Sequence, residues 1–464
     1  MSTTERFVKR TRIEAPAELV MAWHERPGAL ERILPPWEPL RIVDWNRSLV
    51  DGARAVFTVR IGGLPRRWVA DHFDYIPGRQ FCDVQPVGPF AYWRYIHKAD
   101  PDGSNACFYE DNIEYRLPFG YPGRLLGGGY VRRRLERIYT YRHAMVKHDN
   151  LLHARFSQQP LKILVSGSSG LLGSPLVHFL SAGGHSISVL TGDTRGTYAK
   201  VIAWNPKEGA VPLERLEGFD AIVHLDGELG CSNRSADRRN SSGREPLRAT
   251  ELLCQALAKL AAPPRVLVCG SSLAFYGDRG SAELTESAAP GEGSPSELER
   301  AREQLTEPLA DRGIRVAHLR FGTILTWAGG MLRRRLLPHR LGLGYVLGAG
   351  DQYRSWVTLD DALGAVLYVI GSDEICGPVN VSAPNPVRER ELSEILAKAL
   401  GRPAPLRIPK SLPGILQGGM NGGALASTRV QPAKLLETGY RFRNPELDSA
   451  VRHLLGIRDP SAEK

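Results

Sequence analysis

One segment, residues 161–173, constrains the fold of this chain more than any other. It opens with the apolar run Leu161–Val165, which is typical of a buried parallel strand. The run passes into a turn with three glycines, and a helix is predicted from there to about Ala182. A second run at Ser186–Thr191 completes the strand, helix and strand of a βαβ unit. The sequence therefore predicts an α/β fold with a doubly wound parallel sheet.

The three glycines of the turn have different expected roles. Gly167 permits a tight turn, Gly170 lets backbone N–H groups approach a diphosphate, and Gly173 lets the helix pack closely on the strand. The unpaired N–H groups and the dipole at a helix N-terminus favour negative charge. We therefore predict that the turn binds the diphosphate of a dinucleotide. The predicted binding residues are Gly167, Ser168, Ser169, Gly170, Leu171, Leu172 and Gly173.

The end of the second strand predicts which nicotinamide dinucleotide is bound. Sites for NAD usually carry a carboxylate there, which binds the ribose hydroxyls. This chain has Thr191 at that position, with Asp193 two residues later and Arg195 beside it. Arg195 and the Thr191 hydroxyl suit a 2′-phosphate, so the sequence favours NADP over NAD. The alternative is that Arg195 is a solvated loop residue.

Two further apolar runs, residues 221–225 and 266–270, predict strands of the same sheet. Ligands of open parallel sheets bind beyond the carboxyl ends of the strands, so residues at both ends are predicted to contact the cofactor. A histidine at the end of a buried strand is nevertheless more typical of a hydrogen-bonded core residue. The predicted contacts are His224, Leu225, Asp226, Gly227, Gly270 and Ser271.

The pattern before residue 157 is different. Apolar and polar residues alternate at period two, as in residues 54–61 and 107–115, and turn signals such as Asp102-Gly103 separate the runs. This predicts antiparallel hairpins, with two short helices near the start and a longer helix at about Tyr130–Val146. A polar connector at residues 157–160 separates the two patterns. The predicted domains are therefore residues 1–156 and 161–464.

Three segments make the first region resemble the START-like (SRPBCC, helix-grip) superfamily, especially its polyketide cyclase-like branch. They are Trp37-Glu38-Pro39, residues 74–81 and Gly88-Pro89-Phe90. The resemblance implies an α+β domain whose long helix closes an apolar cavity over a curved sheet, and a hydrophobic small-molecule ligand. The inward aromatic residues expected to line the cavity, or to pack in an ordinary core, are Phe57, Phe73, Tyr109 and Tyr115.

The second region resembles the epimerase-like branch of the extended short-chain dehydrogenase/reductase superfamily. Besides the glycine turn, the motifs that carry the resemblance lie at residues 319–325, 348–352, 355–361, 377–386 and 430–442. It implies a Rossmann-like sheet, a small C-terminal substrate subdomain, a terminal segment at about 405–455 and a NAD(P)-dependent oxidoreductase or epimerase. The predicted substrate contacts are Glu228, Arg320, Gly322, Thr323, Arg354, Ser355 and Trp356.

The catalytic group of that superfamily is incomplete in this chain. The resemblance assigns substrate orientation to Ser272, but Ser294 and Leu298 stand where a Tyr-x-x-x-Lys pair is expected. A general acid or base typically contributes about 10²–10⁴-fold to a rate, so another proton donor is needed if the protein is an enzyme. The candidates are Tyr276, Asp226, Glu228, Arg354 and Asp361, although a role at a helix N-terminus is favoured for Asp361. The alternative function is a weakly catalytic or non-catalytic NADP(H)-binding sensor or carrier.

Composition excludes several other classes. Lysine and arginine outnumber aspartate and glutamate by 60 to 50, but the excess is diffuse and no nucleic-acid motif accompanies it. The runs Arg132–Arg134 and Arg333–Arg335 are interpreted as solvated helix faces. Six dispersed cysteines indicate neither a disulfide framework nor a metal site. No run is long enough to span a membrane and no secretory signal is recognised, so a cytoplasmic location is expected.

Overall fold

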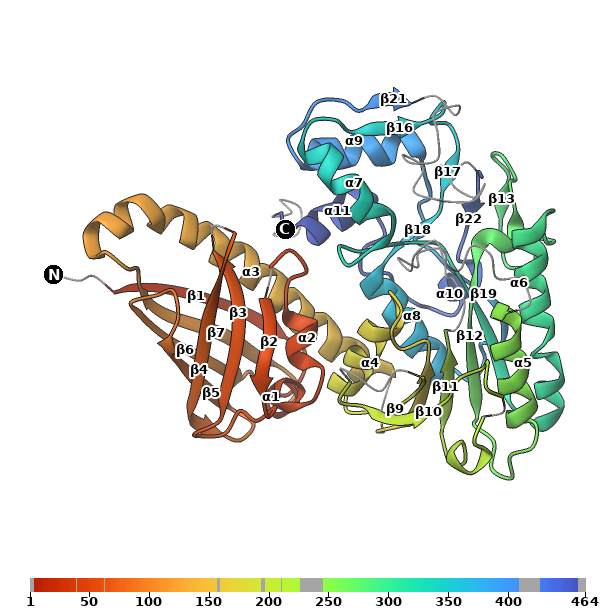
Figure 1. The fold of residues 1–464 in the computed structure, drawn as a ribbon, viewed down its shortest axis with the longest axis horizontal. Helices are drawn as coiled ribbons and strands as arrows, with labels where there is room; N and C mark the ends of the chain where they lie inside the picture. Colours follow the sequence, from red (N-terminus) through yellow and green to blue (C-terminus); the bar gives the residue numbers. More distant parts are fainter. Residues whose placement is uncertain are drawn as a thin grey trace. The chain divides into compact units, whose positions relative to one another are not determined.

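The computed structural model describes residues 4–38, 40–61, 63–156, 159–192, 197–209, 211–225, 245–408 and 426–457 (Figure 1). The chain forms two compact units. The first unit comprises Met1–Gln158, His178–Gly184 and Leu455–Lys464, and the second comprises Gln159–Val177 and His185–Leu454. No helix of the described residues is both long enough and apolar enough to cross a membrane.

The first unit contains one antiparallel sheet of seven strands in the order β1-β7-β6-β5-β4-β3-β2. Consecutive strands from β2 to β7 pair as neighbours, which confirms the predicted hairpins. The strands are β1 (Glu5–Ile13), β2 (Leu40–Trp45), β3 (Arg54–Ile61), β4 (Leu64–Ile76), β5 (Gln80–Val87), β6 (Tyr92–Pro101) and β7 (Cys107–Arg116). The short helices α1 (Ala17–Glu25) and α2 (Ala29–Ile33) lie between β1 and β2.

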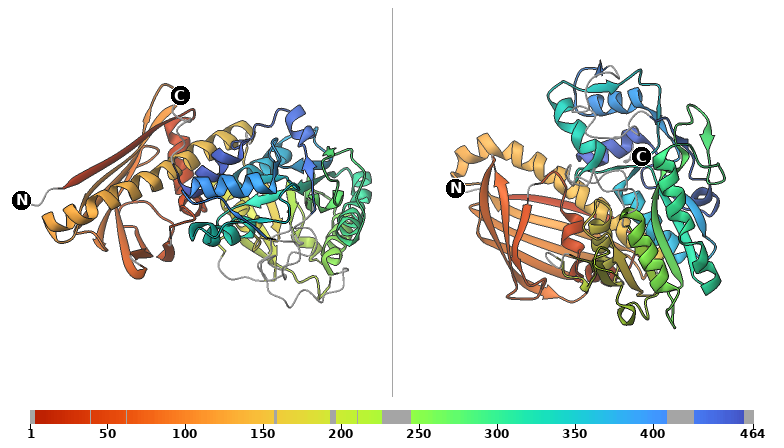
Figure 2. Two further views of the ribbon diagram at one scale, coloured as in Figure 1. Left: turned by 90° about the horizontal axis from the view of Figure 1, so that it is seen from above. Right: turned by 45° about the vertical axis from the view of Figure 1, so that its right-hand side comes forward.

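The closing helix α3 spans Gly120–Phe156 and runs along the sheet (Figure 2). The prediction of Tyr130–Val146 was therefore too short by ten residues at each end. Its first ten residues contain five glycines and have no apolar face toward a core, so they carry no helical periodicity.

The predicted alternation holds on β7, where Tyr109, Ile113 and Tyr115 are fully buried in the core. Phe57 lies on the same face as the buried Ala55 and pairs with Trp68, so its inward placement holds although it is only partly buried. The prediction was wrong for Phe73, which lies on the face opposite the buried His72. The Arg94 guanidinium lies 5.6 Å from the centre of the Phe73 ring.

The second unit confirms the predicted parallel sheet. Its seven strands have the order β10-β9-β8-β11-β12-β14-β19, and every neighbouring pair is parallel. The strands are β8 (Lys162–Ser166), β9 (Ser186–Thr191), β10 (Lys200–Ala203), β11 (Ala221–His224), β12 (Val266–Ser272), β14 (Arg315–Phe321) and β19 (Gly377–Val381). The chain leaves β8 toward one edge of the sheet and returns at β11 toward the other, which makes the end of β8 the switch point where such folds bind ligands.

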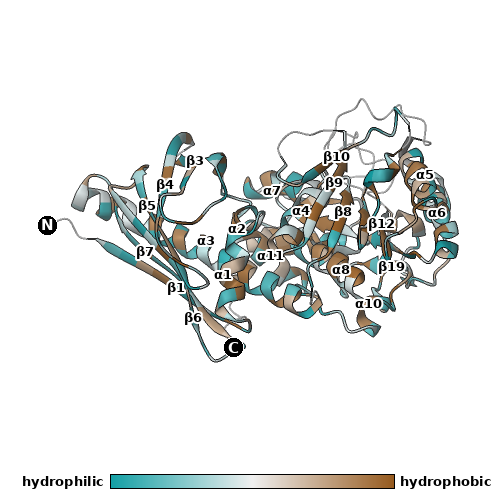
Figure 3. Ribbon diagram, turned by 90° about the horizontal axis from the view of Figure 1, so that it is seen from below, coloured by the Kyte–Doolittle hydropathy of each residue, from teal (hydrophilic) through white to brown (hydrophobic). Residues whose placement is uncertain are grey.

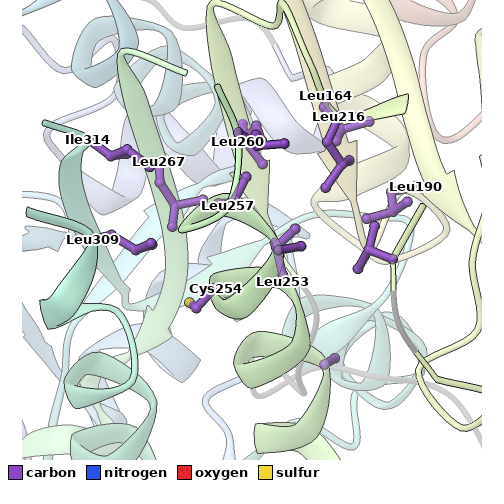
Figure 4. Close-up of a cluster of buried hydrophobic side chains, with 14 of the residues drawn as sticks. Leu164, Leu190, Leu216, Leu253, Cys254, Leu257, Leu260, Leu267, Leu309 and Ile314 are labelled. Carbon is purple, nitrogen blue, oxygen red and sulfur yellow. The ribbon is translucent and has the colours of Figure 1, made fainter. Parts of the chain in front are cut away.

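Helices cover both faces of this sheet (Figure 1). They include α4 (Gly173–Ala182), α5 (Glu245–Leu257), α6 (Ser294–Gln304) and α8 (Leu359–Gly371). The side chains of Leu253 and Leu257 on α5 pack against Leu267 of β12 in a leucine-rich cluster (Figure 4). Segments of the parallel strands such as residues 163–165 and 266–269 are apolar and buried, because both faces of the sheet are covered (Figure 3).

Short strands and helices complete the second unit and join segments that are far apart in sequence. The paired strands are β13 (Glu283–Leu284) with β22 (Arg429–Val430), β15 (Thr323–Leu325) with β18 (Trp356–Thr358), β16 (Tyr345–Leu347) with β21 (Leu406–Ile408), and β17 (Tyr353–Arg354) with β20 (Val387–Arg388). The remaining helices include α7 (Gly330–Arg340), α9 (Glu389–Ala399), α10 (Ala433–Glu437) and α11 (Leu447–Leu455).

Candidate cofactor and active site

The glycine turn lies between β8 and α4, as the sequence predicts. Gly167 has a φ of +72°, and the N–H of Gly170 donates to the Gly167 carbonyl oxygen at 3.0 Å. A Cβ on Gly173 would lie 2.1 Å from that carbonyl oxygen and 2.9 Å from the Ser168 Cα. Gly173 is therefore required because the helix begins against the turn itself, and not, as predicted, because it packs on the strand. The result is a bend with exposed backbone and no room for side chains at its closest point.

The His224 side chain contacts Ser166, the last residue of β8 before this turn. Its Nδ1 lies 2.7 Å from the Ser166 Oγ and its Nε2 lies 3.0 Å from the Thr250 Oγ1. The ring is 1% exposed, and burial lowers the pKa of His224 to about 3, so the ring is neutral. The side chain is the hydrogen-bonded core residue weighed as the alternative above. It links the end of β11 to β8 and to α5.

The other predicted cofactor residues are placed as follows. Leu225, Gly270 and Ser271 are buried at the ends of β11 and β12, and Thr191 is partly exposed at the end of β9. Arg195, Asp226, Gly227 and Glu228 lie outside the described residues.

Ser272 stands at the end of β12 and contacts a carboxylate that the sequence analysis missed. Its Oγ donates to Glu299 Oε1 at 3.2 Å and accepts a hydrogen bond from the Ala274 N–H at 3.3 Å. Glu299 is 4% exposed, and its Oε2 accepts a hydrogen bond of 2.6 Å from Arg302 Nη1. The neighbouring Ser271 donates to Glu299 Oε2 at 3.2 Å. Glu299 directly follows Leu298, the position where the Lys of the Tyr-x-x-x-Lys pair is expected. This position in the sequence could have identified Glu299 as a candidate site residue.

Tyr276 is placed for packing more than for proton transfer. Its hydroxyl receives a hydrogen bond of 2.9 Å from Arg320 Nη1 and lies 2.7 Å from the Asn380 Oδ1. The side chain is fully buried, and burial raises the pKa of Tyr276 despite the opposing effect of Arg320. A hydroxyl with these partners keeps its proton at neutral pH and is a poor base.

The Arg320 side chain is also held by other residues of the protein. It forms a two-point ion pair with Glu303, with Nε to Oε1 at 2.9 Å and Nη2 to Oε2 at 2.7 Å. Its guanidinium also lies 3.5 Å from the centre of the Phe275 ring. At 3% exposure this arginine is a structural ion pair in the described residues, not the open substrate contact that was predicted.

The remaining predicted substrate residues also have protein partners. Arg354 Nε donates to Glu389 Oε2 at 3.0 Å, and the Ser355 Oγ donates to the Thr428 carbonyl oxygen at 2.9 Å. Trp356 is fully buried. Gly322 and Thr323 lie beside Ser355, where β15 pairs with β18. The Thr323 N–H donates to the Ser355 carbonyl oxygen at 2.9 Å. These contacts hold the small strands of the second unit together.

The predicted helix N-terminal role of Asp361 is confirmed. Thr358 is the N-cap of α8 and accepts a hydrogen bond of 3.1 Å from the Asp361 N–H. The Asp361 carboxylate in turn accepts N–H groups of Arg443 and Asn444 at 2.6 and 3.1 Å. Burial raises the pKa of Asp361. The group is committed to these contacts and does not face a reacting centre.

A shallow cavity of about 270 Å³ opens beside β17 and β20 of the second unit. Two guanidiniums lie near the Tyr353 ring there, that of Arg388 5.2 Å and that of Arg429 5.4 Å from the ring centre. None of the predicted site residues lines this cavity. Its lining residues are Tyr353, Pro384, Asn385, Pro386, Arg388, Glu391, Arg429 and Gln431.

A group of buried polar residues lies inside the first unit, where the sequence predicted an apolar cavity. The Asp111 carboxylate is fully buried on the same face of β7 as Tyr109, whose hydroxyl donates to it at 2.9 Å. His143 Nε2 and His97 Nδ1 lie 3.2 and 3.0 Å from its two oxygens. Burial alone would raise the pKa of Asp111, but the hydrogen bond from His143 and the adjacent His97 ring hold it well below its usual value. The interior therefore contains an ionised carboxylate.

Several other buried polar atoms of the first unit have no hydrogen-bond partner among the described residues. His24 Nδ1 lies 2.8 Å from the Val20 carbonyl oxygen, and burial lowers the pKa of His24 to about 3. The neutral ring therefore carries its proton on Nδ1 and offers Nε2 as an acceptor. In the described part of the chain, this Nε2, the Nε of Arg142 and the Nε1 of Trp93 are buried without a hydrogen bond. No set of three His, Cys, Asp or Glu side chains among the described residues is arranged to hold a metal ion.

Residues 163–381 match the NAD dependent epimerase/dehydratase family, and residues 408–454 match a domain of unknown function, DUF1731. The "Epimerase family protein Mb2239" of Mycobacterium bovis is 31% identical over 291 residues, which are 62% of this chain and 96% of the relative. The chain belongs to this epimerase family. The human epimerase family protein SDR39U1 is 28% identical over 301 residues, covering 64% of this chain and 100% of the relative.

Two solved structures of this epimerase family extend the comparison. The nucleoside-diphosphate sugar epimerase from Corynebacterium glutamicum has 28% identity and a TM-score of 0.78, and the match covers 98% of this chain and 94% of that one. Its likeness therefore includes the first unit as well as the second. Human SDR39U1, solved with NADPH, has 26% identity and a TM-score of 0.54 over 63% of this chain and 99% of its own.

Proposed function

We propose that the second unit of this epimerase family member binds NADP(H) and acts on a small polar substrate as an oxidoreductase or epimerase. The observation that carries the proposal is the bend at Gly167–Gly173, where α4 begins so close to the turn that Gly173 has no room for a Cβ and the backbone at Ser169 and Gly170 is exposed. A human relative solved with NADPH supports the choice of cofactor. When bound, the nicotinamide supplies or accepts a hydride.

The residues that hold the cofactor follow from their positions. Backbone N–H groups of Gly167–Gly173 bind the diphosphate at the N-terminus of α4. The Thr191 hydroxyl and Arg195 select the 2′-phosphate of NADP. Leu225, Gly270 and Ser271 line the ends of the adjacent strands, and Asp226 and Gly227 continue from the first of them.

Proton transfer is assigned to Ser272 and Glu299, in place of the missing Tyr-x-x-x-Lys pair. Ser272 orients the substrate oxygen, and in the direction of alcohol oxidation it passes the substrate's proton to Glu299 through the hydrogen bond of 3.2 Å. Reduction reverses the path. Arg302 fixes the Glu299 carboxylate with a hydrogen bond of 2.6 Å and acts as a positioning residue.

A panel of carbonyl compounds with purified protein and NADPH tests this assignment. Ser272→Ala and Glu299→Gln should each lower the rate of NADPH oxidation by about 10²–10⁴-fold while the Kd for NADPH stays unchanged. The exposed Ser281→Ala is the matched control and should keep the full rate. Equal turnover by Glu299→Gln and the parent protein contradicts the proposed proton path.

A sensor or carrier is the second candidate function, because the buried Tyr276 and the absent Tyr-Lys pair remove the usual acid. In that case NADPH binds and stabilises the fold, by about 2.7 kcal/mol at a hundredfold excess over Kd, without turnover of any tested carbonyl. Thermal unfolding with and without NADPH, run beside the rate assay, separates the two functions.

We further propose that the first unit is a START-like domain that binds a small molecule between α3 and the sheet. The strand order and the long closing helix support this. The unpartnered His24 and Arg142 atoms change the expected ligand, because a purely hydrophobic molecule would leave them unsatisfied. The ligand then carries hydrogen-bonding groups as well as an apolar body. Native mass spectrometry should show a co-purified mass that is lost in His24→Phe.

A further inference from the structure

The start of α3 exposes more large apolar side chains than any comparable stretch of the described residues. Phe119 and Leu126 are each 87% exposed, and Tyr121 and Leu125 are 71% and 73% exposed. Tyr130 is also exposed. Single exposed apolar residues need no explanation, but five within twelve residues form a patch that marks an interaction site.

The same segment carries only positive charge. From residue 115 to residue 135 there is no aspartate or glutamate, while five arginines occur. Arg132 and Arg133 are exposed, and neither is paired with a carboxylate in the described part of the chain. Arg124 and Arg134 are used differently, because they bind Glu5 and Glu38. The free arginines therefore lie beside the exposed leucines without a counter-charge.

The hairpin between β3 and β4 adds a second element of the same character. Its tip exposes Ile61 and Leu64, followed by the exposed Arg66 and Arg67. In the antiparallel register the ends of β3, β5 and β7 and the starts of β4 and β6 fall at one end of the sheet, where α3 also begins. In Figures 1 and 2 the first turns of α3 extend past this end.

We propose that this end of the first unit docks on the surface of a membrane that contains anionic phospholipids. The docking surface, here called the basic apolar end, consists of Phe119, Tyr121, Leu125, Leu126, Tyr130, Arg132 and Arg133, with Leu64, Arg66 and Arg67 of the hairpin. Leucine and aromatic side chains bury themselves at the boundary of headgroups and acyl chains, and arginines bind lipid phosphates. A nucleic acid would match the charge but would leave the leucines exposed. The contact is peripheral, since it involves the tip of a helix and a hairpin and no spanning segment.

Co-sedimentation of the full chain with lipid vesicles tests this proposal. The chain should bind vesicles of 70% phosphatidylcholine and 30% phosphatidylglycerol at 50 mM salt, and bind vesicles of phosphatidylcholine alone at least tenfold more weakly. Raising the salt to 500 mM should weaken binding, because screening shortens the reach of the charges. R132E/R133E should weaken binding at least about 30-fold, from about 1 kcal/mol for each arginine near such a surface.

Two double substitutions separate the apolar contribution from the charge. L125S/L126S should lower binding at least tenfold with an unchanged thermal unfolding curve, because both side chains are exposed in the free protein. The matched controls are L341S/L343S and R402E/R407E, which change exposed residues of the second unit and should bind as the parent does. The proposal is overturned if the parent does not sediment with anionic vesicles, or if L125S/L126S and its control bind equally. It is also overturned if light scattering shows a dimer that L125S/L126S disrupts and vesicles never bind.

Discussion

The glycine turn of the second unit and the polar interior of the first unit are both candidate ligand sites, and they are built in opposite ways. The turn consists of seven consecutive residues whose backbone makes the site, and side chains are excluded at Gly173. The interior consists of side chains from separate elements, which meet around Asp111. A site made of backbone can be recognised from one continuous stretch of sequence. A site made of side chains depends on which elements pack together in the folded protein.

The largest expected effect is a loss of NADPH affinity when the glycine turn is disrupted. Gly173→Ala places a Cβ 2.1 Å from the Gly167 carbonyl oxygen, so the turn must move. We expect a loss of NADPH affinity of at least about 100-fold by isothermal titration, equal to about 2.7 kcal/mol. Gly129→Ala, at a helical glycine where only the end of an arginine side chain lies near, is the control and should bind NADPH as the parent does. Unchanged affinity in Gly173→Ala would show that the turn is not the diphosphate site.

A change of comparable size in the free energy of unfolding is expected when the buried carboxylate of the first unit is neutralised. Asp111→Asn keeps the shape but removes the charge that His97 and His143 share, which should lower the free energy of unfolding by about 3–5 kcal/mol. Asp71→Asn breaks an exposed pair with Arg54 and should cost less than about 1 kcal/mol. Urea unfolding at pH 7 measures both. If the two variants are equally stable, the interior carboxylate is not an ionised, paired group.

A smaller effect concerns pH and is present in both units. The pKa values of His24 and His224 are lowered to about 3 in the folded chain, against about 6.5 when unfolded. Each neutral ring therefore contributes stability that is complete above pH 6.5 and is lost as the pH falls toward 3. When the pH falls from 7 to 5, each histidine should lower the free energy of unfolding by about 2 kcal/mol. The loss is about 1.4 kcal/mol for each pH unit and begins only below about pH 6.5.

Two variants check this pH dependence, and each is the control for the other unit. His24→Phe should reduce the difference in unfolding free energy between pH 7 and pH 5 for the first unit, and His224→Gln should do so for the second. Near-UV circular dichroism follows the two transitions in urea. A pH dependence that is unchanged in both variants would contradict the assignment of neutral, buried rings.

The sequence predicted the sheets better than the side-chain sites. Period-two alternation and apolar runs identified both sheets, because burial on one face or on two imposes those patterns directly. The length of α3 was underestimated, because its first ten residues are held by backbone hydrogen bonds and not by an apolar face. Glu299 was missed because its partner Ser272 lies 27 residues away. Arg320 and Trp356 were assigned to the substrate, although ion pairing and packing already occupy them.

The amino-acid sequence by itself determined the glycine turn, since each glycine is required by a neighbour within a few residues and no distant contact can replace it. It also determined which strands are covered on both faces. Only the tertiary structure decided that Tyr276 is enclosed, that Ser272 meets Glu299 and that Asp111 lies between two histidines. The physical reason is that the proton affinity of a side chain depends on its solvation and its partners, and folding brings these from segments that are far apart in sequence.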